Sequence, residues 1–166
     1  MYKVTQPKIE DRNKQAYVGI RTKASSPELP TVIPQTLDEV FAWLGQRGIA
    51  PAGAPFIRYY VINMETQMDI ELGVPVARPV QGDGRVSGGV LPAGRYAVLV
   101  YTDVTKGMKG NKVLVDWAKD NGIEWDHWDD ANGDAFRSRY ESFLTPPDTE
   151  PDNTKWETEV AIKLAD

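Results

Sequence analysis

The sequence lacks cysteine altogether and contains a single histidine, His127. Without cysteine there can be no disulfide or thiolate metal site, and one histidine cannot build a histidine-rich metal centre. Catalysis by a Ser/His or Cys/His pair is disfavoured for the same reason. The acidic loop at residues 124–133 does not have the spacing of an EF-hand. We therefore expect neither a metal ion nor a cofactor.

Long hydrophobic runs are missing as well. No apolar run approaches the roughly 18 residues of a membrane span, and residues 1–8 lack the apolar centre of a signal peptide. The chain is therefore expected to have no contact with a membrane and to be cytoplasmic.

Positive charge is in deficit, with 19 Lys and Arg against 24 Asp and Glu and a net charge of −5. Proteins that bind nucleic acid usually carry a basic stripe, which this sequence lacks. Direct DNA binding by this chain is therefore not expected. An acidic protein still attracts cationic ligands.

The remaining composition is that of one globular domain spanning residues 1–166. Hydrophobic residues make up 41% of the chain and charged residues 26%, and this length suffices to bury most of the apolar surface.

The first half of the chain predicts a strand, a helix and a hairpin. Residues 15–22 are rich in strand formers, and residues 23–30 are typical of a loop. A helix is expected to begin near Pro34 and to end at Gly48, because apolar residues recur every three or four positions between them. The strands predicted at 56–63 and 68–76 pair as a hairpin, and alternation in the second predicts one buried face and one facing water.

The same order of elements returns in the second half. The strand, the helix and the two following strands are expected at residues 96–102, 108–121, 136–144 and 159–164. Trp117 stands five residues before a glycine, as Trp43 does in the first half. We interpret this as an internal duplication with halves at residues 1–77 and 84–166.

These elements predict an α+β fold built from a duplicated strand–helix–strand–strand unit. Its antiparallel sheet would carry two helices on one face and a groove between the two halves. Ligand pockets form preferentially at such junctions.

One acid interrupts a predicted strand near that groove. Glu141 lies inside residues 136–144, and glutamate is depleted in strands and seldom buried without a partner. It is either a solvent-facing acid paired with Arg137 or Arg139, or a carboxylate held for a ligand.

The C-terminal residues resemble a known family. The sequence reads RYESFLTPPDTEP at 139–151 and WETEVAIKL at 156–164, which is similar to the C-terminal signature of GyrI-like domains, the effector-binding domains of MerR- and AraC-type multidrug regulators. The resemblance implies that Glu141 faces an aromatic-lined cavity and meets lipophilic cations. Two positions depart from the family pattern, because Ala161 and Lys163 replace an aromatic residue and a proline. No helix-turn-helix segment precedes the domain, so DNA regulation is not implied for this chain, and a separate regulator protein is a candidate partner.

Aromatic residues are the other candidates for the ligand site. Tyr60 stands opposite Glu141 in the alignment of the two halves, and Phe143 follows on the same strand face. The wider set of candidates comprises Glu141, Tyr60, Phe143, Tyr101, Trp117 and Trp128. For Trp43 and Trp117, packing between helix and sheet is the alternative. For Trp128, the surrounding loop at 124–133 is either a lid over the groove or a solvated loop.

Three functions remain open. The first is binding of a hydrophobic small molecule, cationic or aromatic, in a pocket containing Glu141. The second, which the resemblance to some family members implies, is hydrolysis of strained cyclopropane-bearing compounds with Glu141 as general acid or base. The third is a protein-interaction adaptor.

Overall fold

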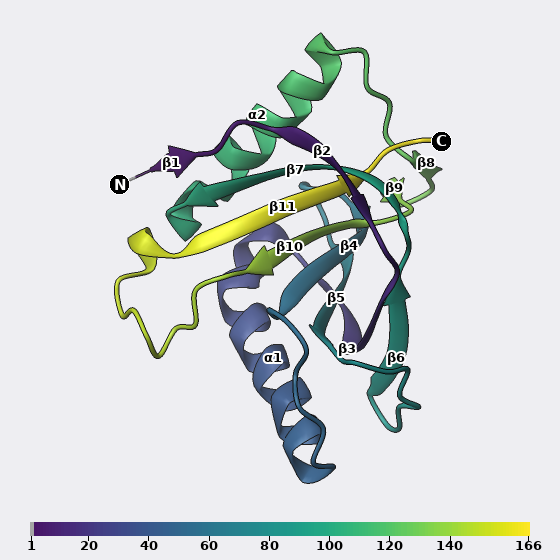
Figure 1. The fold of residues 1–166 in the computed structure, drawn as a ribbon, viewed down its shortest axis with the longest axis vertical. Helices are drawn as coiled ribbons and strands as arrows, with labels where there is room; N and C mark the ends of the chain where they lie inside the picture. The colour runs from purple at the N-terminus through teal and green to yellow at the C-terminus, as the bar shows by residue number, and fades with distance from the viewer. Residues whose placement is uncertain (1) are drawn as a thin grey trace.

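The computed structural model describes residues 2–166, which form an α+β fold (Figure 1). Within these residues two α-helices accompany one antiparallel sheet, as predicted. The elements are β1 (Lys3–Val4), β2 (Lys8–Arg12), β3 (Gln15–Ala24), α1 (Leu29–Gln46), β4 (Phe56–Ile62), β5 (Met68–Pro75), β6 (Val86–Leu91), β7 (Gly94–Thr102), α2 (Gly107–Asp120), β8 (His127–Asp130), β9 (Gly133–Phe136), β10 (Arg139–Phe143) and β11 (Glu157–Lys163).

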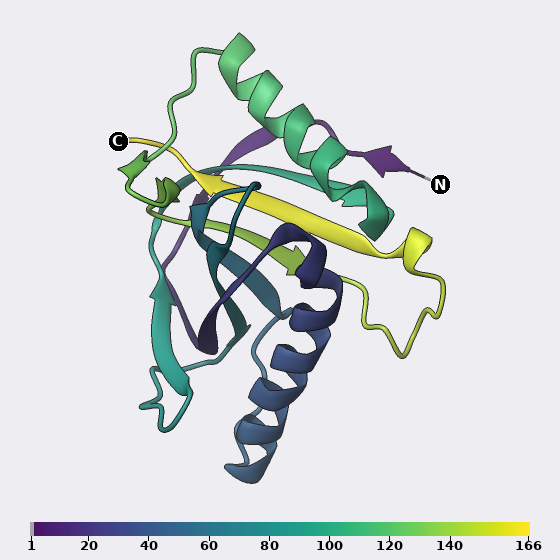
Figure 2. The same ribbon diagram turned by 180° about the vertical axis from the view of Figure 1, so that it is seen from behind.

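The six central strands of the sheet have the same organisation when followed from either side. The order is β1-β7-β11-β10-β4-β5-β3-β6, so β7-β11-β10 come from one half and β4-β5-β3 from the other. The halves meet where β10 pairs with β4, and there Tyr140 lies opposite Arg58. Helix α1 packs on β3 and β5, whereas α2 packs on β7. Figure 2 shows both helices on the near side of the sheet, with β10 and β11 visible between them.

Apolar side chains form three clusters that follow this arrangement. The first lies under α1 and the second under α2, and the partly buried Ile62 packs against both. The third occupies the opposite face of the sheet and contains Tyr17, Phe56, Tyr96 and Tyr140. The rings of Tyr17 and Phe56 meet edge to face at 5.0 Å. Both faces of the central strands are therefore covered.

Burial on both faces corrects one expectation. The face of β5 that carries Glu71 was predicted to see water, but Glu71 is only 5% exposed. The residues opposite Glu71 are Arg21 in β3 and Arg58 in β4, and the hydroxyls of Tyr17 and Tyr60 donate to its carboxylate, so these side chains keep it from water.

The first helix begins earlier than the sequence predicted. It starts at Leu29 rather than near Pro34, which lies inside the helix. The segment before it, expected to be a loop, contains a 3₁₀ turn over Ser26–Glu28. The backbone N–H and the hydroxyl of Ser25 both donate to Glu28 Oε1 at 2.8 Å. This Ser-x-x-Glu pattern is a capping box, which the sequence reading overlooked.

The strand predicted over residues 136–144 is broken in two. The chain leaves the sheet at Arg137, whose N–H donates to the carbonyl of Asp126 at 2.9 Å. Strand β9 therefore belongs to a hairpin with β8, and this hairpin replaces much of the predicted loop at 124–133.

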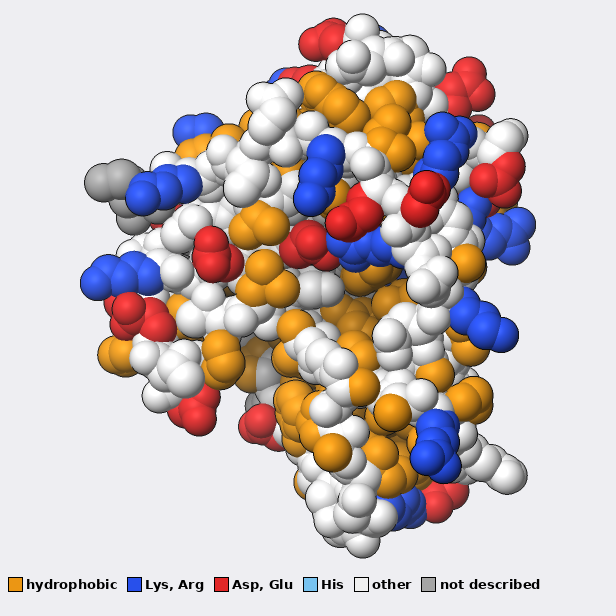
Figure 3. Space-filling view, in the orientation of Figure 1, with side chains coloured by type: hydrophobic (Ala, Val, Ile, Leu, Met, Phe, Trp, Pro, Cys, Tyr) orange, Lys and Arg blue, Asp and Glu red, His pale blue; other side chains and the backbone are white. Residues whose placement is uncertain are grey.

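Charges of both signs are mixed on the surface visible in Figure 3, and neither α-helix within residues 2–166 is suited to cross a membrane. On the face shown in Figure 3, Lys and Arg side chains alternate with Asp and Glu, and no basic stripe is visible. Within residues 2–166, no helix has both the length and the apolar character needed to cross a bilayer.

Two helical glycines provide a test of this packing. A methyl group added at Gly110 in α2 would lie 2.6 Å from a ring carbon of Tyr101, whereas one added at Gly45 in α1 meets no atom within 4 Å. We expect Gly110→Ala to destabilise the fold by about 1–3 kcal/mol through overpacking. Gly45→Ala should be neutral or stabilising by up to about 1 kcal/mol. Denaturant unfolding measures both, and equal effects would contradict the packing of α2 on Tyr101.

Candidate functional site

Glu141 lies on the central strand β10, between the two halves. It pairs with Ile57 of β4 and with Val160 of β11. Residues directly opposite each other in an antiparallel sheet share a face, and Ile57 and Val160 belong to the clusters under α1 and α2. The side chain of Glu141 therefore points to the face that the helices cover. It is 8% exposed, so the solvent-facing alternative is wrong.

Side chains from both halves surround this carboxylate, and two from the second half donate to it. The hydroxyl of Tyr101 in β7 donates to Oε1 at 3.1 Å, and the side-chain amide of Asn111 in α2 lies 3.4 Å from Oε2. Tyr59 in β4 lies near the carboxylate and, like these donors, opposes the rise of its pKa. A buried carboxylate requires such partners.

Arg139 supplies a positive charge on the same face, two residues before Glu141. Its Nη2 donates to the side-chain oxygen of Asn111 at 2.9 Å, so Asn111 bridges the two charged groups. The guanidinium is itself buried, and within residues 2–166 its Nε has no hydrogen-bond partner. The charge of Glu141 is therefore partly balanced without a direct ion pair.

Burial controls the protonation of this pair. It raises the pKa of Glu141, and the charge of Arg139 and the donated hydrogen bonds offset this only in part. Burial also lowers the pKa of Arg139. A carboxyl with a raised pKa can hold or transfer a proton closer to neutral pH than an ordinary glutamate.

The structure places the remaining predicted residues in different regions. Tyr101 contacts Glu141, and Phe143 packs on the edge of the first cluster. Trp117 packs against the second cluster and Trp43 is buried in the first, as in the packing alternative. Ala161 belongs to the third cluster, and Lys163 lies two residues further along β11, so these two departures from the family pattern face away from Glu141.

Tyr60 does not lie opposite Glu141. Residues 57 and 59 of β4 share the face of Glu141, whereas Tyr60 points to the opposite face. Tyr59, the preceding residue, shares the face of Glu141 instead. Tyr59 and Asn111 were missed by sequence reasoning, although the period of two along the strand was a signal for Tyr59.

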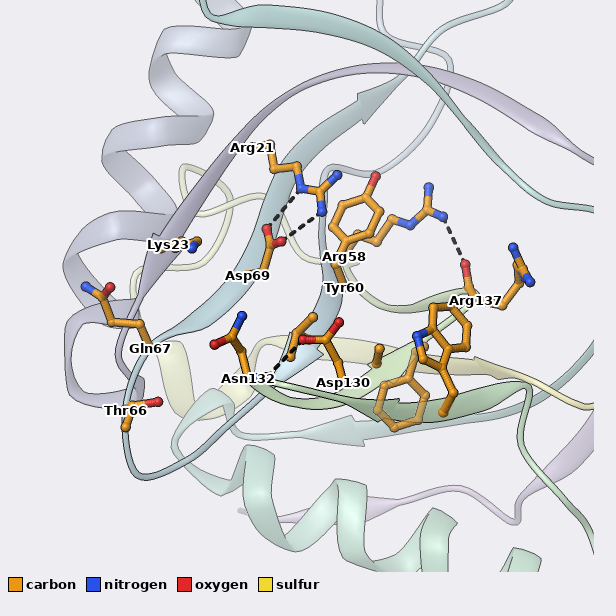
Figure 4. A pocket seen from close by; sticks show the side chains of 14 residues that line it. Arg21, Lys23, Arg58, Tyr60, Thr66, Gln67, Asp69, Asp130, Asn132 and Arg137 are labelled. Carbon is orange, nitrogen blue, oxygen red and sulfur yellow. Dashed lines mark hydrogen bonds and ion pairs between the residues drawn. The ribbon is translucent and has the colours of Figure 1, made fainter.

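Tyr60 and Trp128 line a cavity on the other face of the sheet. Its volume is about 570 Å³, and we call it the far-face cavity (Figure 4). Strands β3, β4 and β5 supply Arg21, Lys23, Arg58, Tyr60 and Asp69, and the β8–β9 hairpin and the residue that follows it supply Trp128, Asp130, Phe136 and Arg137. Residues 124–133, considered as a lid over the groove, thus form a wall of this cavity instead. Within residues 2–166, no three His, Asp or Glu side chains are grouped to hold a metal ion.

Comparison with protein families matches residues 5–165 to the GyrI-like small molecule binding domain. The chain therefore belongs to the GyrI-like family of small-molecule binding domains. Comparison with curated protein sequences gives no match.

Solved structures share this fold at low sequence identity. The EcmrR C-terminal domain matches with a TM-score of 0.69 at 18% identity, over 96% of this chain and 97% of that chain. In an EcmrR–DNA complex the TM-score is 0.76 at 18% identity, and the match covers 98% of this chain but 57% of that chain.

Two further structures differ in what they contain. SAV2435 bound to tetraphenylphosphonium matches with a TM-score of 0.59 at 9% identity, over 97% of this chain and 94% of that chain. A hydrolase from Listeria innocua matches with a TM-score of 0.66 at 8% identity, over 96% of this chain and 92% of that chain. Identities this low establish the fold, while the DNA, the ligand and the activity belong to those proteins.

The raised pKa of Glu141 predicts a pH-dependent stability. Folding favours the protonated carboxyl, so the contribution of Glu141 is fully present below its unfolded pKa and is lost as pH rises through its folded pKa, which lies above the ordinary 4.5. We expect Glu141→Gln, which cannot ionise, to gain stability relative to the wild type as pH rises from about 4 through the raised folded pKa of Glu141. Urea unfolding of both proteins at each pH measures the difference, and a difference that does not change with pH contradicts the burial of an ionisable Glu141.

Proposed function

We propose that this domain binds a hydrophobic small molecule, aromatic or cationic, at Glu141, where the two halves of the sheet meet. Small-molecule binding is the property of the family. The observation that supports this location is the carboxylate itself, which is buried on a central strand and held by donors from β7 and α2. Burying a charge costs several kcal/mol, so a site of this kind is a candidate for function.

The surroundings of Glu141 suit an apolar ligand. Tyr59 and Phe143 share its face and remain partly exposed at the edge of the first cluster. Ile62 packs against both clusters at the same junction. An aromatic ligand seated here would extend the apolar contact between the halves.

The charges of Glu141 and Arg139 determine which ligands this site prefers. A ligand cation is attracted by Glu141 and repelled by Arg139, and both groups are buried, where electrostatic interactions are strong. The ligand of this proposal therefore carries one positive charge beside aromatic rings, and it competes with Arg139 for the carboxylate.

Two variants with opposite effects test this proposal. Tetraphenylphosphonium serves as the cation and triphenylphosphine oxide as its neutral counterpart. Glu141→Gln should weaken binding of the cation by roughly 1.5–3 kcal/mol and leave the neutral compound nearly unaffected. Arg139→Gln should tighten binding of the cation, because it removes the competing charge. Calorimetry measures the affinities of the wild type and of both variants for the two compounds. Equal changes for the two compounds would remove Glu141 from the site.

Hydrolysis is the second candidate, because Glu141 has a raised pKa and the hydroxyl of Tyr101 lies 3.1 Å from it. These are the features of a general acid or base with a positioned partner. The hydrolase from Listeria innocua has the same fold.

The enzymatic candidate predicts more product than protein. A strained cyclopropane that water opens slowly should be opened in many turnovers, and Glu141→Gln should retain substrate affinity but lose roughly 10²–10⁴-fold in kcat. A binding site alone would instead protect an equimolar amount of the compound. Chromatography of substrate and product over time distinguishes these outcomes, and a single turnover or none is the result that excludes the enzyme.

A further inference from the structure

The far-face cavity differs from the Glu141 site in its charge. Four basic residues line it, namely Arg21, Lys23, Arg58 and Arg137, whereas Asp69 and Asp130 are its only acids within residues 2–166. The whole chain has the opposite balance, with a net charge of −5. Both acids already have partners: Asp69 accepts two hydrogen bonds from Arg21 at 2.9 and 2.8 Å, and Asp130 accepts from the N–H of Asn132 at 2.9 Å. Arg137 also lies 3.8 Å from Asp126, a residue outside the lining that pairs with Lys163 as well. The positive charges of Lys23, Arg58 and Arg137 still outnumber the remaining acid of the lining, Asp130.

Arg58 is the buried member of this group. It is 8% exposed, and its hydrogen bonds go to neutral oxygens, which are the hydroxyl of Tyr17 at 2.9 Å and the carbonyls of Val90 and Arg137 at 3.1 and 3.0 Å. Its Nε has no hydrogen-bond partner within residues 2–166. The carboxylate of Glu71 is reached only through the hydroxyl of Tyr17, which donates to it. A buried guanidinium without a direct anionic partner is suited to a ligand carboxylate.

Flat surfaces accompany these charges. The ring of Tyr60 lies between two guanidiniums, with the central carbon of Arg21 at 3.8 Å from its centroid and that of Arg58 at 4.6 Å. Trp128 is 45% exposed, and Arg137 stands over its ring at 5.3 Å. Figure 4 shows Arg58 beside the ring of Tyr60 and the hydrogen bond from Arg58 to Arg137. Aromatic and guanidinium planes are surfaces on which a flat ring stacks.

We propose that the far-face cavity is a second binding site, for a small planar aromatic carboxylate. The ring stacks on Trp128, and the carboxylate is held by Arg137 and by the charge of the Arg58 guanidinium, which lines the cavity. The volume of about 570 Å³ is in the range of ligand sites. This site is independent of the one proposed at Glu141, since it lies on the other face of the sheet and selects the opposite charge.

Three compounds with one ring system test the proposal. They are 1-naphthoate, 1-naphthamide and 1-naphthylmethylammonium, which carry a negative charge, no charge and a positive charge. Calorimetry on the full chain should show that the carboxylate binds at least about tenfold more tightly than the amide, the effect of a hydrogen bond to a charged group. Arg137→Gln removes the charge but keeps the backbone carbonyl that Arg58 uses, and it should weaken naphthoate binding by about tenfold.

Two control variants decide the location of the site. Arg85→Gln removes an exposed arginine that pairs with Glu39 at 2.7 Å and does not line the cavity, so it should leave naphthoate binding unchanged. Glu141→Gln should also leave it unchanged, which separates this proposal from the one above. Equal affinity for the three compounds, an unaffected Arg137→Gln, or a loss of naphthoate binding in either control would each overturn the proposal.

Discussion

A negative charge buried on the central strand of the sheet is the constraint on which the helix-covered face depends. The residues opposite Glu141 on the two neighbouring strands, Ile57 and Val160, are apolar and cannot satisfy its carboxylate. Its hydrogen-bond donors come from β7 and α2, so α2 has to pack on the sheet before the charge is satisfied. Gly110 belongs to this arrangement, because it lets α2 approach the ring of Tyr101. The packing of α2 and the stabilisation of the Glu141 carboxylate therefore depend on each other.

Strand β4 contributes residues to both proposed binding sites, the one at Glu141 and the far-face cavity. Tyr59 and Tyr60 are neighbours in the chain, yet Tyr59 lies near Glu141 under the helices, whereas the hydroxyl of Tyr60 donates to Glu71 on the other face. The register between β4 and β5 shifts between Tyr59 and Val61, so Tyr60 sits at a β-bulge. Bulges redirect side chains next to functional sites. Each face therefore pairs a buried glutamate with tyrosines, but the far face is surrounded by arginines.

The fold could be predicted from the sequence because its helices and strands follow from the spacing of apolar residues. The spacing of Leu37, Val40 and Leu44 predicted α1, and the alternation around Ile70 predicted β5. The family resemblance also implied an aromatic environment for Glu141, and Tyr101 was among the candidate residues. Asn111, Arg139 and Glu71 were different, since their roles depend on contacts between residues far apart in the chain, which no local pattern encodes. A difference of one residue along β4, between Tyr59 and Tyr60, was enough to change the face.

The side-chain amide of Asn111 offers the most direct test of where the ligand binds, because it contacts both Glu141 and Arg139. Nuclear magnetic resonance can follow its signals while tetraphenylphosphonium is added. If the ligand binds at the junction of the two halves, the Asn111 amide signals should shift and saturate together with the binding measured by calorimetry. Saturable binding that leaves the Asn111 amide unmoved and shifts the indole of Trp128 instead would contradict the assignment of the site to Glu141.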